Sequence, residues 1–353
     1  MATMEAWLTE EWQRSSPWQF LLRPISWLFR LLTAARRNAY RFGLLKSHSV
    51  GVPVIIVGNI TVGGTGKTPL VLALVKALTT QGIRCGIVTR GYRRLPNANL
   101  AAVSKVDPTI GSAVVVSDEA TLLARRSGVP VYAGADRVEA ARTLLRNHAE
   151  VAVIISDDGL QHFALQRAFE VCVVDGARGF GNGSLLPAGP LREPASRLCA
   201  VDAIVFNGND RHGSLPCVPV ATPAFSMTLA NELFINLKSD RRIDLRDALA
   251  EFKTSRIYAL AGIGHPQRFF SHLTGLGFVL TASQPFPDHH QYRAGDMPGM
   301  DAQIILMTEK DAVKCGSFVD DRMWYMRVDA LLPIAFTDLI LKKLLHLRAD
   351  HVT

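Results

Sequence analysis

The sequence predicts an α/β protein whose core is a parallel β-sheet with helices on both faces. Short, continuous apolar runs alternate with stretches of helical periodicity, which is typical of strands that are buried on both sides. Each apolar run ends in polar residues, and open parallel sheets bind their ligands at the carboxyl ends of their strands. A glycine-rich loop follows the first run. With 353 residues, 48% of them hydrophobic, the chain can form two packed lobes.

The elements of the first lobe follow in order from Gly51. A strand at Val54–Val57 leads into the glycine-rich loop, and a helix is expected at Pro69–Leu78. The further strands of this lobe are expected at Ile83–Thr89, Val114–Val116, Val151–Ile155, Val171–Val174 and Ala203–Phe206, with a helix through Arg125. This order of elements predicts a sheet like that of the P-loop NTPases.

A smaller second α/β lobe is expected to begin near Ala224. Its elements are strands at Ile257–Leu260 and Ile304–Met307, a helix through Phe270, and a terminal helix from about Leu332 to Leu347. The predicted organisation is therefore an N-terminal segment at 1–50, a P-loop domain at 51–223 and a second lobe at 224–353.

The glycine-rich loop has the composition of a phosphate-binding loop. It consists of Thr61, Val62, Gly63, Gly64, Thr65, Gly66, Lys67 and Thr68. Backbone N–H groups and the positive end of the following helix can hold the β- and γ-phosphates of ATP. Lys67 can neutralise charge on those phosphates, and Thr68 can ligate Mg²⁺. The loop departs from the pattern GxxxxGK[ST], because Thr61 stands at the first glycine position. Val62 stands where dimeric ATPases place a second lysine.

Two acidic pairs follow predicted strands. Asp157 and Asp158 come after Val151–Ile155, the arrangement that supplies a magnesium-binding carboxylate in P-loop enzymes. The alternative is a pair that caps a helix or starts a turn. Asp118 and Glu119 either combine a base with a metal ligand or cap a helix N-terminus.

A long loop rich in glycine and proline, Gly179–Glu193, follows Val171–Val174. A loop of this length is usually functional or disordered, and its apolar residues and single arginine favour function. Phosphoryl transfer to an alcohol needs positive charge and a group that accepts a proton. The candidates for the charge are Arg90, Arg93, Arg192 and Lys67, and those for orienting a base are His162, His289 and His290.

The first fifty residues combine basic and aromatic side chains. They hold seven basic and three acidic residues, a net charge of +4, and four of the five tryptophans. Arginines interrupt the apolar run and Pro24 is expected to break it, so it falls short of a spanning helix. The mixture favours a helix that lies in a membrane interface and contacts anionic lipid. A helix that packs on the protein core is the alternative.

The remaining composition excludes several classes of protein. The five cysteines are scattered, odd in number and form no CxxC pair, which argues against a disulfide framework or zinc site and for a reducing compartment. The net charge of +8 suits phosphates, anionic lipid or nucleic acid. The sequence contains no base-stacking aromatic module, so we expect no nucleic-acid partner.

A series of motifs runs in order from about residue 50 to 315. The motifs are Gly58–Pro69, Arg90–Tyr92, Ser117–Glu119, Asp157–His162, Leu186–Glu193, Asp288–His289 and Thr308–Lys314. Together they resemble the tetraacyldisaccharide 4'-kinase family, the lipid A 4'-kinases of Gram-negative bacteria.

The resemblance implies an ATP- and Mg²⁺-dependent kinase on the cytoplasmic face of the inner membrane, peripheral or monotopic. Its substrate would be an acylated glucosamine disaccharide 1-phosphate, phosphorylated at the 4'-hydroxyl to give lipid IVA. Asp118 would be the base, assisted by His289, with Lys67 as a further catalytic residue. The resemblance also implies that the second lobe closes over the site. We expect a monomer.

The remaining implied roles concern charge around the phosphates. Glu119, Asp157 and Asp158 would manage magnesium, and Arg192 would lie on the phosphate or substrate side. His290 competes with His289 for the role beside the base. The alternative function is a P-loop ATPase switch of the dimeric type, which the missing second lysine and the proline-rich loop disfavour.

Overall fold

The structure is a computed structural model that describes residues 11, 12, 14, 17–91, 103–108, 117–209, 221–299, 301–316 and 318–349. Some expectations fall outside these residues. They concern the strand Val114–Val116, the side chains of Trp7, Tyr92 and Arg93, and Cys217.

The packing of Cα atoms divides the chain into two units. Unit 1 comprises Met1–Arg90, Asp136–Thr228 and Leu331–Thr353, and unit 2 comprises Gly91–Ala135 and Leu229–Ala330. The sequence suggests contiguous lobes at 51–223 and 224–353, whereas these units each take a segment from the other's range. The ranges expected for independently folding domains stay a prediction.

Long-range packing explains the exchanged segments. Helix α4 (Asp118–Ser127) belongs to unit 2 because it packs against α8 (Glu309–Ala312). Helix α9 (Ile334–Ala349) belongs to unit 1, where the ring of Phe336 packs edge-on against Phe225.

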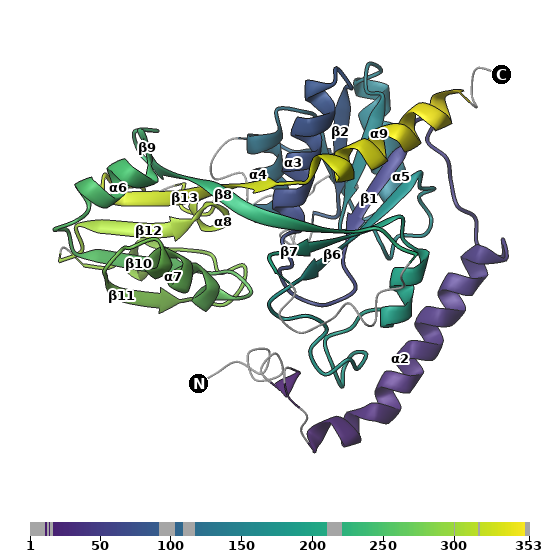
Figure 1. Cartoon of the computed structure of the whole chain (residues 1–353), viewed down its shortest axis with the longest axis horizontal. Helices are drawn as coiled ribbons and strands as arrows, with labels where there is room; N and C mark the ends of the chain where they lie inside the picture. The colour runs from purple at the N-terminus through teal and green to yellow at the C-terminus, as the bar shows by residue number, and fades with distance from the viewer. Residues whose placement is uncertain are drawn as a thin grey trace. The chain divides into compact units, whose positions relative to one another are not determined.

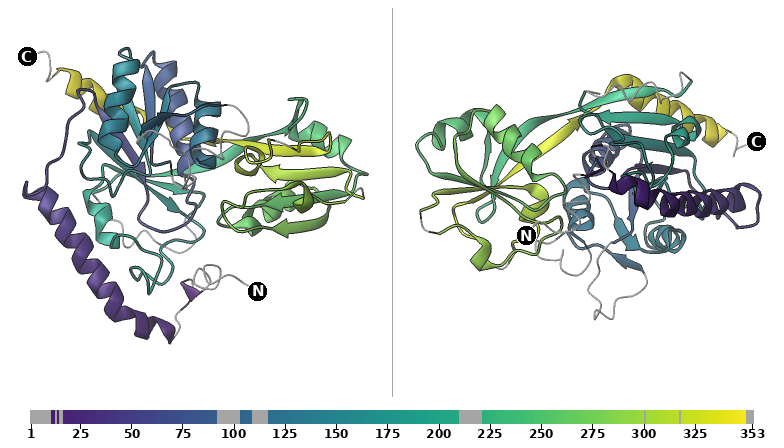
Figure 2. Two further views of the ribbon diagram at one scale, coloured as in Figure 1. Left: turned by 180° about the vertical axis from the view of Figure 1, so that it is seen from behind. Right: turned by 90° about the horizontal axis from the view of Figure 1, so that it is seen from below.

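The core of unit 1 is a parallel sheet (Figures 1 and 2). Its strands, in spatial order, are β2 (Cys85–Thr89), β5 (Val153–Asp157), β1 (Val54–Gly58), β6 (Phe169–Asp175), β7 (Ala203–Asn207) and the start of β8 (Ala224–Asn236). All five pairings are parallel. Every residue of β1, β2 and β5 is buried, as expected for strands covered on both faces.

Helices α3 (Lys67–Thr80) and α5 (Arg137–Asn147) pack against this sheet, and the 3₁₀ helix η2 (Ala195–Ala200) precedes β7. The predicted fold class, a P-loop NTPase-like parallel sheet flanked by helices with a second α/β part, is confirmed.

Unit 2 is built on a second parallel arrangement. Its strands are β11 (Leu280–Pro285), β10 (Ile257–Ala261), β12 (Ile304–Thr308) and β13 (Met323–Leu331), in that order. Antiparallel pairs join β9 (Arg242–Asp244) to the end of β8, and β3 (Val103–Lys105) to β4 (Val131–Gly134). The helices are α4, α6 (Leu245–Glu251), α7 (Pro266–Gly275), α8 and the 3₁₀ helix η4 (Ala294–Asp296). Phe234, Phe252, Phe278 and Trp324 form an aromatic core.

The N-terminal segment forms α2 (Trp18–Arg41), the purple helix in Figure 1. The helix continues through Pro24, so the break expected there does not occur. A proline removes one backbone donor, which the helix tolerates at this position. The large apolar side chains of α2 are exposed, and its buried residues are Gln19 and Ser26. Among the described residues, no helix is both long and apolar enough to span a bilayer.

Candidate active site

The glycine-rich loop connects the carboxyl end of β1 to α3 in unit 1. Gly63 and Gly66 have φ angles of 89° and 92°, which glycine adopts without strain. A Cβ at Gly66 would lie 2.3 Å from Asn207 Nδ2, so no larger residue fits there without movement. A Cβ at Gly64 would meet no atom within 4 Å. The backbone of the loop therefore packs closely against Asn207 at Gly66, whereas a side chain at Gly64 would meet no neighbour.

Polar side chains from two neighbouring strands hold the loop in place. Asn207, the last residue of β7, donates from Nδ2 to the carbonyl of Thr65 at 3.1 Å. Arg178 donates from Nη2 to the carbonyl of Gly64 at 2.5 Å, and its Nε bonds Asp175 at the end of β6 at 3.1 Å. These donors bond carbonyl groups of the loop and do not use its N–H groups.

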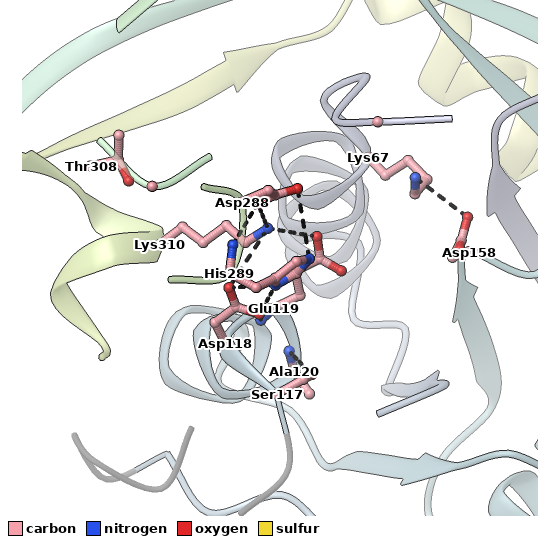
Figure 3. A network of polar contacts seen from close by, with 12 residues as sticks. Lys67, Ser117, Asp118, Glu119, Ala120, Asp158, Asp288, His289, Thr308 and Lys310 are labelled. Carbon is pink, nitrogen blue, oxygen red and sulfur yellow. Dashed lines mark hydrogen bonds and ion pairs between the residues drawn. The ribbon is translucent and has the colours of Figure 1, made fainter. Parts of the chain in front are cut away.

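Lys67 begins α3 and pairs with the acid after β5. Its Nζ lies 3.3 Å from Asp158 Oδ1 (Figure 3). The same Nζ lies 3.2 Å from Asn59 Oδ1. Arg192 Nη1 lies 3.3 Å from the other oxygen, Asp158 Oδ2. Burial alone would raise the pKa of Asp158, but the charges of Lys67 and Arg192 lower it to about 2. The structure therefore brings three predicted site residues together.

The two acids after β5 differ in their surroundings. Asp157 is the last residue of the strand, is buried, and accepts a hydrogen bond from Thr89 Oγ1 at 3.4 Å. Asp158 adopts a left-handed backbone, with φ of 50°. Such angles in a non-glycine residue concentrate at functional sites. Arg137 Nη2 donates to the carbonyl of Asp158 at 3.1 Å, which fixes this turn.

The proline-rich loop runs beside the phosphate-binding loop. Val62 N–H donates to Pro190 O at 2.9 Å, and Arg192 N–H donates to Ile60 O at 2.7 Å. Thr61 and Leu191 form an antiparallel bridge between these two bonds. The backbone of one loop therefore sets the position of Arg192 relative to the other.

A second cluster lies within unit 2, at the N-terminus of α4. Ser117 caps this helix by accepting from Ala120 N–H at 3.2 Å. Asp118 follows it, is 4% exposed, and both its oxygens lie 2.9 Å from His289 Nδ1 (Figure 3). Because an ionised carboxylate only accepts, Nδ1 carries the proton of this bond. Burial would raise the pKa of Asp118, but this bond and the charge of Lys310 lower it to about 2.

Lys310 forms the centre of the acidic group around Asp118. Its Nζ lies 3.1 Å from Glu119 Oε1, 3.3 Å from Asp288 Oδ1 and 3.7 Å from Asp118 Oδ2 (Figure 3). Burial would lower the pKa of Lys310, but these three carboxylates raise it well above its usual range. One ammonium group thus pairs with three acids.

The neighbouring histidines have different partners. His289 has a φ of 62°, and its backbone N–H donates to Asp288 Oδ1 at 3.0 Å. His290 points elsewhere, since its Nε2 lies 3.0 Å from Asp296 Oδ2 and its ring stacks on Phe286. The contact with Asp118 therefore belongs to His289. His162 lies in unit 1, where burial and the charge of Arg137 lower its pKa to about 4.

The donors for magnesium are oxygen atoms. The described part of the chain holds no group of three or more His, Cys, Asp or Glu side chains placed for a metal ion. Nucleotide-bound Mg²⁺ needs only one or two carboxylates, because phosphates and waters complete its shell. Thr68 in the first turn of α3, and the acids Asp157 and Asp158 at the end of β5, are donors of that kind. Glu119, the other predicted ligand, instead pairs with Lys310.

Sequence reasoning assigned no role to some residues of these clusters. They are Asn59, Arg137, Arg178, Asn207 and Lys310. Asn59 and Asn207 lie at carboxyl ends of strands, and that position was a usable signal. Lys310 lies two residues after Thr308, the end of β12, and offers the same signal.

The fold and these two clusters define a P-loop phosphotransferase, which combines a phosphate-binding loop with a paired carboxylate and histidine. The sequence matches the family described as Tetraacyldisaccharide-1-P 4'-kinase over residues 18–345. The chain belongs to this family. The comparisons favour a kinase over a dimeric ATPase switch.

Relatives and a solved structure agree with that family. The chain is 47% identical to a tetraacyldisaccharide 4'-kinase from Methylobacillus flagellatus, with 98% of each chain covered. It is 45% identical to one from Chromobacterium violaceum, over 96% of this chain and 97% of the relative. The crystal structure of "apo" LpxK from Aquifex aeolicus in complex with ATP superposes with a TM-score of 0.76 at 27% identity. It covers 92% of this chain and 99% of the other.

Proposed function

We propose that this protein is an ATP-dependent kinase acting on a tetraacylated glucosamine disaccharide 1-phosphate. The reaction phosphorylates its 4'-hydroxyl and forms lipid IVA in lipid A biosynthesis. The names of the relatives support this substrate, and the ATP in the neighbouring crystal structure supports the donor. The contact of Asp118 with His289 carries the proposal, because an alcohol acceptor must lose a proton.

In this proposal the loop residues 61–68 hold the donor phosphates. A Cβ at Gly64 would meet no atom within 4 Å, and the positive end of α3 adds to the attraction of the loop's N–H groups for phosphate. Lys67 exchanges Asp158 and Asn59 for phosphate oxygens when the nucleotide binds. Arg192 then provides positive charge beside the transferred group.

On the acceptor side, Asp118 takes the proton of the 4'-hydroxyl. A carboxylate with a pKa near 2 is ionised at every physiological pH, although it is a weak base. A weak base suffices in a loose transition state, where the attacking oxygen becomes acidic as its bond to phosphorus forms. His289 donates from Nδ1 to Asp118 and so orients it as that base.

Thr68 and Asp157 or Asp158 would hold magnesium, which would neutralise charge that develops on the phosphates during transfer. Glu119, the third acid predicted for magnesium, pairs with Lys310 in this structure.

The test is a kinase assay with ATP and a tetraacylated disaccharide 1-phosphate in mixed micelles. We expect Asp118→Ala to lower kcat by about 10²–10⁴-fold, the usual contribution of a general base, with little change in ATP affinity. Lys67→Ala should weaken ATP binding as well as turnover. Glu251→Ala, at a surface acid paired with Arg241, is the matched control. Acceptor-independent ATP hydrolysis at the full rate, or full turnover by Asp118→Ala, would contradict the proposal.

We also propose that the protein acts as a monomer bound peripherally to the cytoplasmic face of the inner membrane. The exposed apolar side chains of α2 support contact with lipid; they include Trp18, Leu21, Ile25, Trp27, Leu28 and Leu32. Removal of residues 1–40 should abolish co-sedimentation with vesicles that contain anionic phospholipid. Continued sedimentation of the shortened chain would show that the membrane contact lies elsewhere.

A further inference from the structure

Helix α2 buries polar residues while it exposes apolar ones. Leu21 is 68% exposed and Trp27 is 70% exposed, whereas Ser26 is 5% exposed. A helix that only packed on a protein core would bury its apolar face instead. The buried side of α2 therefore makes specific polar contacts.

Ser26 contacts the proline-rich loop at two backbone groups. Its Oγ accepts from Ala188 N–H at 3.0 Å and lies 3.0 Å from Leu185 O, to which it can donate. Both bonds cross about 160 residues of sequence. A single hydroxyl group thus satisfies two buried backbone groups of the loop.

Trp12 makes a second contact with the same loop. Its indole Nε1–H donates to Pro187 O at 2.9 Å, and its own carbonyl accepts from Asn182 N–H at 2.8 Å. A Cβ at Gly181 would lie 2.6 Å from that carbonyl, so glycine permits the close approach. We call the contacts of Trp12 and Ser26 with residues 182–188 the N-terminal clasp.

The loop held by the clasp continues directly into the site. Ala188 lies four residues before Arg192, whose guanidinium contacts Asp158. Between them, Pro190 accepts from Val62 N–H of the phosphate-binding loop at 2.9 Å. The loop is thus fixed on one side by the N-terminal segment and on the other by the phosphate-binding loop.

We propose that Ser26 and Trp12 are positioning residues that set the loop carrying Arg192. The N-terminal segment then does more than bring the enzyme to lipid, because it also aligns a charge beside the transferred phosphoryl group. This inference rests on the proposed kinase function. Loss of the clasp leaves Lys67 and Asp118 intact but lets Arg192 move, so it lowers kcat and leaves the KM for ATP nearly unchanged.

The test compares Ser26→Ala and Trp12→Phe with wild type. Thr33→Ala is the matched control, because the Thr33 hydroxyl bonds the carbonyls of Phe29 and Arg30 within α2. We expect Ser26→Ala to lower kcat about tenfold, since a buried backbone N–H loses its partner. Co-sedimentation with vesicles of phosphatidylethanolamine and phosphatidylglycerol should match wild type. Unchanged kcat in both variants, or a kcat loss that follows lost vesicle binding, would overturn the inference.

Amide hydrogen exchange separates this inference from the proposed function. Ser26→Ala should make the amides of residues 182–193 exchange about tenfold faster than in wild type, whatever the reaction catalysed. Unchanged exchange there would refute the clasp. If wild type transferred no phosphate to the disaccharide while the exchange still accelerated, the proposed function would fail and the clasp would stand.

Discussion

Replacement of Lys310 by methionine removes the one positive charge at the centre of three carboxylates. Its Nζ lies within 3.7 Å of Asp118, Glu119 and Asp288. At an effective dielectric constant of about 20, each such pair interacts by roughly 4–5 kcal/mol before desolvation is subtracted. Loss of one partner from a largely buried pair costs about 3–5 kcal/mol. We therefore expect Lys310→Met to lower the free energy of unfolding at pH 7 by about that amount.

The loss of stability in Lys310→Met should depend on pH, and the ionisation of the carboxylates determines in which direction. The pKa of Asp118 is lowered from 3.8 to about 2 in the folded protein. Its ionised form therefore contributes stability that is present above pH 3.8 and is lost as the pH falls toward 2. Without Lys310 the pKa of Asp118 is lowered less. The difference in the free energy of unfolding between variant and wild type should therefore be largest near neutral pH. This difference in the free energy of unfolding should become smaller below about pH 4.

Urea unfolding at pH 7 and at pH 3 measures both expectations. Lys310→Arg keeps the charge and should recover much of the lost stability. Lys238→Met is the matched control, since Lys238 pairs with Asp321 at the surface, where solvent screens the pair and its loss should change stability little. Equal unfolding midpoints for wild type and Lys310→Met at pH 7 would refute the reasoning. So would a gap between them that stays constant down to pH 3.

Two further predictions concern the two clusters. Gly66→Ala should reduce ATP affinity by about tenfold or more, because the φ angle of 92° and the close approach to Asn207 force the loop to move. Isothermal titration calorimetry with ATP measures the affinity, and an unchanged affinity would contradict the prediction. His289→Ala should lower kcat by about 100-fold, whereas His290→Ala should retain most of it, since only the former contacts Asp118. Equal losses in the two variants would refute the assignment.

The sequence predicted those parts of the fold that local patterns encode. The strands β1, β5, β6 and β7 were expected within two residues of their observed bounds, because each is a continuous buried apolar run. The phosphate-binding loop could also be predicted from the sequence, since its glycines and lysine stand between a predicted strand and a predicted helix. Local chemistry was enough for these elements.

Other features depend on partners that are distant in the chain. Arg126 Nη1 bonds Glu309 at 2.7 Å and its other nitrogen contacts Asp329, which ties α4 to unit 2 across about 180 residues. No periodicity near Arg126 indicates that contact. The assignment of the Asp118 contact to His289 rather than His290 is a second such case. The two residues are adjacent and identical, and the left-handed backbone at His289 distinguishes them in the structure. Burial, partners and backbone angle decide such roles, and a single sequence carries none of them.

The two clusters use charge in opposite ways, and this difference fits the two halves of a phosphoryl transfer. In unit 1, Asp158 is surrounded by the cations Lys67 and Arg192, so an arriving phosphate can take over positive charge that is already present. In unit 2, Lys310 is surrounded by acids, and Asp118 stays ionised because it accepts from His289 Nδ1 at 2.9 Å and lies 3.7 Å from Lys310 Nζ. Asn207 and Arg178 hold the phosphate-binding loop through its carbonyl groups rather than its N–H groups. In the proposed reaction, the first cluster would attract the donor phosphates and Asp118 of the second would accept the proton.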